Sequence, residues 1–395
     1  MPISQSDPLE FSSLFSASGL RTAPAQVWRG LRLVPILSDR IQDDLRLARR
    51  VYEGFLTFVD LPQDKVYFSF VPHAYVLEYN PEGLPLAAPQ TQLSKADGQR
   101  WKGLPVRSLQ RMAKHEKGPA GQRLLRFLPL HLAMEGYLTA YFNAPRVDWR
   151  DDYLRYAISH GLDPRIEYTL PGRCVDGLEE ALRIFEIHPQ QVGMLLFIAE
   201  ALAAVMIYPH PADYRLLHRS LLEDFFGEVV GWYYAHLPYR APQLPLAAAG
   251  EVNSWAEVRA RLEQLSGELD AFQRTMASGV LASPVRLREV QGLGPYRLQS
   301  FISELRPDEG VDAHIGEAII GSEGRLAYLK TCTLTRDQIR RAWFLERLDA
   351  HDWSLDLTAA AMNLKKDALV LKLDACGLGR LLQPKVIEQA RKRLG

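Results

Sequence analysis

The chain has 395 residues, of which 47% are hydrophobic and 24% charged, and its 47 Lys and Arg are balanced by 47 Asp and Glu. This is the composition of an ordinary globular protein of two or three domains, and it excludes collagen-like, low-complexity and small disulfide-bonded classes. Zero net charge excludes a uniformly basic nucleic-acid-binding surface, although it permits segments of opposite charge. The three cysteines have no metal-ligand spacing, so we predict no metal, no cofactor and no disulfide framework.

The N-terminal residues lack the basic and continuously apolar regions of a secretory signal. The longest apolar run, residues 192–207, is interrupted by Glu200 and is shorter than the ~20 residues that a membrane span requires. We therefore expect a cytoplasmic protein without a membrane partner.

Three segments near the N-terminus predict regular structure. Residues 28–37 alternate apolar and basic side chains before a proline, which predicts a half-buried or edge strand. Residues 39–55 carry apolar side chains at helical spacing and predict a helix. Residues 66–79 are rich in β-branched and aromatic residues, which predicts a strand pair or a strand bent at Pro72.

A proline-rich connection follows and contains a basic insert. Between residues 95 and 126 there are nine Lys and Arg against two Asp and Glu, a net charge of +7. Within it, Arg107, Arg111 and Lys114 share one face of a predicted helix. This face is either a solvated surface or an auxiliary anion-binding surface, because clustered cations attract phosphates.

The middle of the chain predicts a buried hairpin and an amphipathic helix. Residues 192–198 are continuously apolar and 202–208 could pair with them across Ala199-Glu200, with a single buried helix as the alternative. Residues 211–230 carry one apolar stripe and predict a helix.

Further along, residues 254–276 predict a helix with Ser254 as N-cap and Glu257 completing a capping box. Residues 287–302 predict a glycine-containing turn into a strand, with a phosphate-binding helix-hairpin-helix as the alternative. Two apolar runs around a glycine-rich turn predict a β-hairpin over 317–329.

Residues 188–230 resemble the central signature of the ARPP domain family, in which two strands, a proline turn and an amphipathic helix follow one another. The residues that fit it are Gln191, Gly193, Phe197, Ile198, Pro211, Tyr214, Leu221 and Leu222. Residues 28–37 resemble the family's opening strand, and 292–294 and 317–329 resemble its closing strands. The resemblance implies an α+β fold and, by association alone, a link to nucleotide or ADP-ribose metabolism.

No catalytic residues can be named. His210 and His218 have no metal-ligand spacing, and Cys174 has no specified base partner. The acids and arginines of residues 148–155 form either solvated ion pairs or a carboxylate pair in a cleft. A binding protein is therefore favoured over an enzyme.

The final segment is helical in pattern and basic. From Thr335 to the last residue it contains twelve Lys and Arg against eight Asp and Glu, a net charge of +4. Thr335 and Gln338 predict a capping box at its start. Two short helices follow, over 356–362 and 366–375, and Asn363 between them tolerates the left-handed conformation of a tight turn.

This pattern resembles the Fis-type helix-turn-helix that closes many bacterial enhancer-binding regulators. The matching positions are Ala359, Met362, Asn363, Leu364, Lys365, Lys366, Leu369, Lys372, Leu373, Gly377 and Leu378. The resemblance implies a homodimer that places the second helix in the major groove of double-stranded DNA. The residues that it assigns to DNA binding are Lys365, Lys366, Ala368, Lys372, Lys385, Arg391, Lys392 and Arg393.

Four residues of the second helix depart from the family pattern. Val370 and Leu371 stand where groove-facing polar residues are usual, and Asp367 and Asp374 add negative charge. The alternative is a protein-interaction scaffold that keeps the helix-turn-helix for dimerisation. An exposed apolar patch at Val370 and Leu371 would favour it.

We predict an α+β protein with an N-terminal extension over 1–25, an ARPP-like domain with β-hairpins and amphipathic helices over 26–334, and a small all-α helix-turn-helix domain over 335–395. The expected function is a DNA-binding regulator whose N-terminal domain recognises a small-molecule or protein ligand. The alternative from another class is an enzyme or effector of a nucleotide-linked or defence system.

Overall fold

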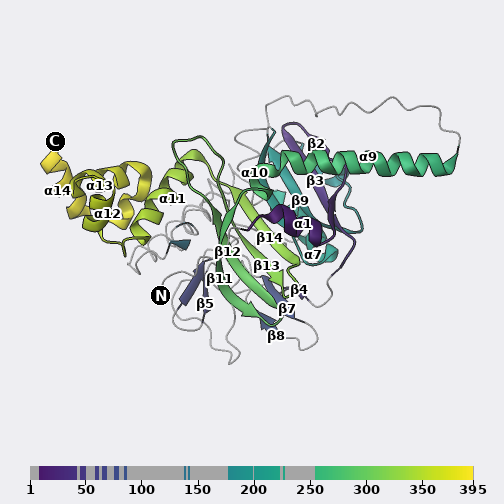
Figure 1. Ribbon diagram of the computed structural model, residues 1–395, viewed down its shortest axis with the longest axis horizontal. Coiled ribbons are helices and arrows are strands. Elements are labelled where there is room, and N and C mark those ends of the chain that lie inside the picture. Colours follow the sequence, from purple (N-terminus) through teal and green to yellow (C-terminus); the bar gives the residue numbers. More distant parts are fainter. Residues whose placement is uncertain are drawn as a thin grey trace.

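The computed structural model describes residues 9–41, 177–198, 200–222, 226 and 254–394, together with short segments between residues 45 and 142. A nine-stranded antiparallel sheet forms its centre (Figure 1). The strand order is β1-β3-β9-β10-β14-β13-β12-β11, and β2 pairs with β3. The strands are β1 Leu20–Thr22, β2 Gln26–Trp28, β3 Leu31–Ser38, β9 Gln191–Ile198, β10 Ala201–Ile207, β11 Val285–Leu293, β12 Tyr296–Ser303, β13 His314–Gly321 and β14 Leu326–Thr333.

The two predicted hairpins are confirmed, because β9 pairs with β10 and β13 with β14, and the glycine-containing turn predicted within 287–302 joins a further hairpin of β11 and β12. Their turns contain residues with positive φ, namely Glu200 at 70°, Gly294 at 65° and Gly324 at 73°. The strand interpretation of residues 287–302 is therefore correct, and the helix-hairpin-helix alternative is wrong.

The strand predicted over residues 28–37 is found as β3, but its expected half-buried or edge position is wrong. All eight residues of β3 are buried, and β3 lies between β9 and the pair β1 and β2. The basic residue that produced the alternation, Arg32, is buried because its guanidinium stacks 3.8 Å from the Phe197 ring and donates to Gln273 at 2.6 Å. Pro35 is tolerated because it lies opposite the break between β1 and β2.

The helix predicted over residues 39–55 is also not found in the part that the structure describes. Residues Leu45–Arg49 form strand β4, which pairs with β7 (Tyr75–Tyr79). Leu45, Arg46 and Leu47 alternate at the start of β4, so a period-2 pattern competes with the helical one, and pairing with β7 decides between them. Strand β8 (Leu84–Leu86) pairs with β7, and strands β5 and β6, Phe58–Leu61 and Lys65–Phe68, form a separate hairpin.

Residues 9–25 are part of the central unit and not an extension. Helix α1 (Phe11–Ala17) buries Phe11 and Phe15 completely, and β1 is an edge strand of the large sheet. Leu9 bridges to Val285 at the opposite edge strand β11. The predicted boundary at residue 26 coincides with the start of strand β2, and residues 9–25 before it pack against the same sheet.

Helices cover both faces of the sheet. On one face, α1 and α10 (Ser278–Leu281) pack with apolar side chains such as Val34, Phe197 and Leu329. On the other, α6 (Leu178–Ile184) and α7 (Pro211–Ser220) pack with a second apolar set that continues into the C-terminal helices. Helix α9 (Trp255–Met276) begins at the predicted N-cap, because Ser254 Oγ accepts from Glu257 N at 3.2 Å.

The C-terminal residues form four helices, which are α11 Arg336–Asp349, α12 Leu355–Ala361, α13 Lys366–Leu373 and α14 Pro384–Leu394. The predicted capping box of Thr335 and Gln338 is confirmed at the start of α11. Leu334, Ile339 and Phe344 belong to the same apolar cluster as the sheet, so α11 packs against the central unit. Among the described residues, no helix combines the length and apolar character that a membrane span needs.

Candidate nucleic-acid interface

Helices α12 and α13 lie on either side of the predicted turn. Asn363 has φ 53°, and the N–H groups of Asn363 and Leu364 donate to Ala360 O at 3.1 Å and Ala359 O at 2.8 Å. This is the Schellman arrangement, which satisfies the last carbonyls of α12. Ala359 is 2% exposed, as expected of a small residue where two helices approach.

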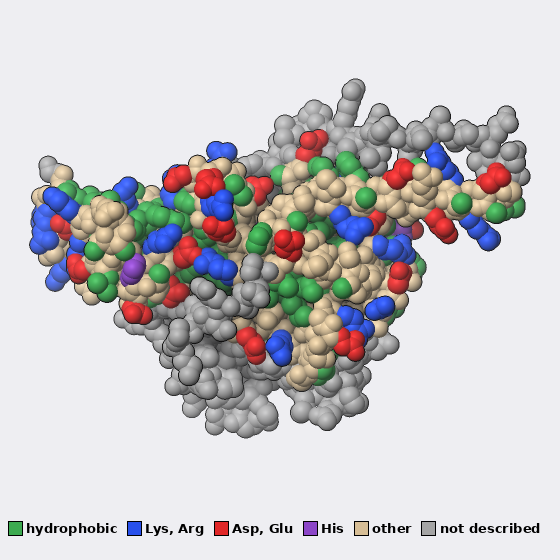
Figure 2. Space-filling model, in the orientation of Figure 1, with side chains coloured by type: hydrophobic (Ala, Val, Ile, Leu, Met, Phe, Trp, Pro, Cys, Tyr) green, Lys and Arg blue, Asp and Glu red, His purple; other side chains and the backbone are tan. Residues whose placement is uncertain are grey.

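The cations predicted to contact DNA divide into two groups. Three of them form ion pairs: Lys366 with Asp356 at 2.7 Å, Arg391 with Asp374 at 2.6 Å and Arg393 with Asp367 at 3.5 Å. Lys365, Lys372, Lys385 and Lys392 are exposed and form no ion pair within the described part of the chain. Figure 2 shows Lys and Arg side chains gathered at this end of the molecule.

The ion pairs also change the interpretation of two acids, Asp367 on α13 and Asp374 directly after it. Asp367 and Asp374 were expected to add negative charge to the second helix, yet each lies beside an arginine of α14. Their negative charge is therefore partly neutralised, and α14 is held against α13.

The structure explains why α13 carries the apolar residues Val370 and Leu371 where the Fis-type pattern has polar ones. Val370 is completely buried and Leu371 is half-buried, so Val370 belongs to the helix packing and does not face solvent. The exposed patch that would favour a protein-interaction scaffold is not formed by these two residues. Ala368 is half-buried in the same helix.

A pocket lies at the end of the sheet where β3 and β10 end, far along the chain from the C-terminal helices. Ser18, Ser38, Arg40, Tyr208 and Arg325 are among its lining residues. The lining residues include two arginines and three hydroxyl side chains, a composition that suits a small anionic group better than a neutral one.

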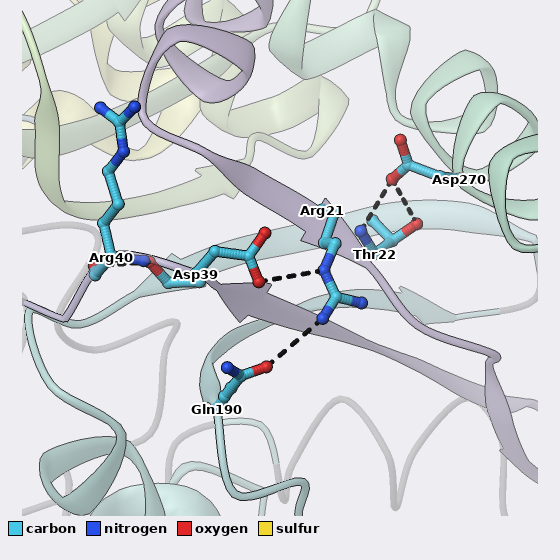
Figure 3. Close-up of polar contacts among 7 residues, drawn as sticks. Arg21, Thr22, Asp39, Arg40, Gln190 and Asp270 are labelled. Carbon is cyan, nitrogen blue, oxygen red and sulfur yellow. Dashed lines mark hydrogen bonds and ion pairs between the residues drawn. The ribbon is translucent and has the colours of Figure 1, made fainter. Parts of the chain in front are cut away.

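The arginines around this pocket differ in their contacts. Arg21 Nε lies 3.4 Å from Asp39 Oδ1, and its terminal nitrogen donates to Gln190 Oε1 at 3.3 Å (Figure 3). Arg40 points away from this pair (Figure 3) and forms no ion pair with a described residue. Arg325 is paired with Glu323 at 2.7 Å. Of the two arginines that line the pocket, Arg40 is therefore the one without an ion pair to a described residue.

Sequence patterns did not identify a buried polar cluster on the face covered by α7. Glu317 Oε2 and Lys330 Nζ are 3.9 Å apart, and both side chains are fully buried. Burial lowers the pKa of Lys330 to about 7 and raises the pKa of the neighbouring Cys332 thiol to about 12. One sequence signal was available. Lys330 lies two residues from both Tyr328 and Cys332, so in a strand its side chain points to the same buried face as theirs.

The family-signature residues have structural roles. Gln191 is fully buried, accepts from His188 N and donates to Gly193 O, both at 3.2 Å. Tyr214 on α7 is hydrogen-bonded to His218 Nδ1 at 2.8 Å. The Gln191 contacts lie at the start of β9 and the Tyr214 contact lies within α7, and a side-chain hydrogen bond between Gln191 and Tyr214 joins the two elements.

The two histidines considered as ligands are structural. His210 caps α7, since its Nδ1 accepts from Ala212 N at 3.0 Å. His218 is 3% exposed, and burial lowers its pKa to about 4. Arg107, Arg111, Lys114, Cys174 and residues 148–155 lie outside the described residues, so the auxiliary basic face and the acidic cluster are not tested.

Comparison with known proteins gives one result. A model of the ARPP-2 family matches residues 15–294, which include the end of α1, the strands β1 to β11 and the predicted signature. The match begins earlier than the predicted boundary and ends before the hairpin of β13 and β14 and the C-terminal helices. No curated protein and no solved structure matches the chain. The chain therefore belongs to the ARPP-2 family.

Proposed function

We propose that the chain binds double-stranded DNA through α12 and α13, which act as a helix-turn-helix with α13 in the major groove. The observation that supports this proposal is the left-handed turn at Asn363, which is followed by the exposed Lys365 and Lys372, neither of which forms an ion pair with a described residue. In helix-turn-helix proteins the first residues of the second helix contact base edges while neighbouring cations contact phosphates.

The ion pairs assign different roles to the predicted cations. Lys365, Lys372, Lys385 and Lys392 are the candidates for phosphate contact. Arg391 and Arg393 hold α14 against α13, and Lys366 joins the start of α13 to α12 through Asp356. This division narrows the DNA-contacting set from eight residues to four.

The ARPP-2 part is then the sensory or interaction unit. Its pocket lined by Arg40 and Arg325 is the candidate site for a small anionic ligand. Two copies on one DNA site are expected, because single helix-turn-helix units usually bind paired half-sites.

The test is binding of the full chain to a fluorescently labelled duplex of mixed sequence across a salt series. We expect affinity to fall with salt, and Lys365→Gln combined with Lys372→Gln to reduce the salt slope by about 2, since each lost phosphate contact removes about 0.9. Arg259→Gln with Arg297→Gln, which removes two arginines distant from α13, is the matched control and should bind like the unmodified chain.

Two results would contradict the proposal. One is the absence of salt-dependent binding to any duplex. The other is an affinity that Lys365→Gln combined with Lys372→Gln leaves unchanged. That result would show that Lys365 and Lys372 are solvated surface residues without a DNA contact.

A further inference from the structure

Among the described residues, the hydrogen bonds that attach helix α9 to the central sheet come from its C-terminal part. Asp270 Oδ1 accepts from Thr22 N at 2.7 Å and from Thr22 Oγ1 at 2.8 Å (Figure 3), and Gln273 accepts from the buried Arg32. The N-terminal half of the helix projects beyond the sheet and the other described helices (Figure 1).

One side of α9 carries an uninterrupted heptad pattern. Apolar residues recur at alternating spacings of three and four, which are the a and d positions of a coiled coil. These residues, called the α9 stripe below, are Trp255, Val258, Leu262, Leu265, Leu269, Phe272 and Met276.

The stripe is exposed most where the helix projects. Trp255 is 82% exposed and Leu262 is 61% exposed, and Val258, Leu265, Leu269 and Phe272 are each only partly buried. Figure 2 shows hydrophobic side chains along this projecting part. A contiguous apolar surface of this kind marks an interaction site, and its strict heptad spacing matches the packing surface of another helix.

We propose that the α9 stripe binds the α9 stripe of a second copy of the chain, in antiparallel orientation. With the helices aligned about their midpoint, Leu262 packs against Leu265 of the second copy, and Val258 against its Leu269. Trp255 then lies opposite Phe272, which pairs two aromatic side chains at each end of the contact.

The charges that flank the stripe select this orientation. Arg261 and Glu268 occupy g positions, which face each other in an antiparallel pair, so Arg261 of each copy meets Glu268 of the other. In a parallel pair Arg261 would face Ser266, and Glu268 would face Gln273, without complementary charge. Gln264 hydrogen-bonds both residues, at 3.0 Å and 2.8 Å, which holds them on the same side of the helix.

This contact is independent of DNA binding. Helices α9 and α11–α14 lie at opposite ends of the molecule (Figure 1), so two copies joined through α9 carry their C-terminal helices at the outer ends. Such a dimer presents two separated basic modules, and it does not by itself place two α13 helices in neighbouring major grooves.

The experiment is sedimentation velocity on the full chain over a wide concentration series without DNA. We expect a monomer–dimer equilibrium that Leu262→Glu weakens by at least about tenfold, because it places two charges in the centre of the contact. Ala260→Glu puts the same charge on the opposite side of α9 and is the matched control, which should dimerise normally. Circular dichroism should show equal helix content in both variants.

Charge exchange tests the orientation. Arg261→Glu and Glu268→Arg should each weaken dimerisation, and the two together should restore it, because the antiparallel pair again joins opposite charges. A monomer at every concentration, a dimer that Leu262→Glu leaves unchanged, or equal loss with Ala260→Glu would overturn the proposal. Failure of the double exchange to restore dimerisation would overturn the antiparallel assignment.

Discussion

Glu317 and Lys330 face each other across β13 and β14, with Oε2 and Nζ 3.9 Å apart and neither side chain exposed to solvent. Ser300 on β12 is the cross-strand neighbour of Glu317, and Met206 on β10 is that of Lys330. The pair thus lies in the middle of the sheet, where an ion costs most to bury without its partner.

Removing one member of this pair should destabilise the protein strongly. Lys330→Met leaves the Glu317 carboxylate buried without its cation, and we expect the free energy of unfolding to fall by about 3–5 kcal/mol. Adding Glu317→Gln should recover much of the loss, because the remaining charge is also removed. Urea denaturation measures the free energy of unfolding of the single and the double variant. If the double variant is no more stable than Lys330→Met alone, the buried unpaired charge is not the cause of the loss.

The buried histidines should make the protein sensitive to acid. Burial lowers the pKa of both His218 and His314 to about 4. The unfolded chain gains protons as pH falls below about 6.5, while the folded protein does not until about pH 4, so the free energy of unfolding decreases through this window. The expected loss is up to about 3 kcal/mol per histidine.

His314→Leu tests this expectation. Neither ring nitrogen of His314 has a hydrogen-bond partner among the described residues, and its ring lies 6.0 Å from that of Phe301. We expect the variant to lose about half of the pH dependence between pH 6.5 and 4, measured by urea unfolding at several pH values. An unchanged slope would show that His314 is not one of the responsible groups.

Gly193 should tolerate no side chain. A Cβ at this position would lie 2.0 Å from Met206 O on the neighbouring strand β10, so Gly193→Ala must push two central strands apart. We expect a loss of about 1–3 kcal/mol or more, seen as a lower thermal midpoint or as insoluble protein. Gly279→Ala is the control, because a Cβ there meets nothing within 4 Å, and its stability should be unchanged or slightly higher.

Asn363 should be replaceable by glycine but not by alanine. Its φ of 53° costs an alanine roughly 1 kcal/mol, whereas glycine adopts it freely. Hydrogen exchange measured by mass spectrometry should therefore show faster exchange in α12 and α13 for Asn363→Ala than for Asn363→Gly. Equal exchange in the two variants would contradict a turn that depends on the left-handed conformation.

Much of the secondary structure follows from short stretches of sequence. The hairpins of β9–β10 and β13–β14, the N-cap at Ser254 and the capping box at Thr335 each depend on residues within a few positions of one another. The turn residue Asn363 belongs to the same group. Local chemistry determines these features, so they could be predicted before any tertiary structure was known.

Other features depend on contacts between residues that are far apart in the sequence. Arg32 appeared to mark a solvent-facing side of a strand, but Gln273, 241 residues later, and Phe197 make its burial possible. Likewise, pairing with β7 made a strand of residues 45–49, and packing around α13 buried Val370. The sequence determined which hairpins, caps and basic helices this protein has. Tertiary packing decided which charges are buried, which are paired and which remain available to a ligand, because desolvation and ion pairing depend on neighbours that no local pattern specifies.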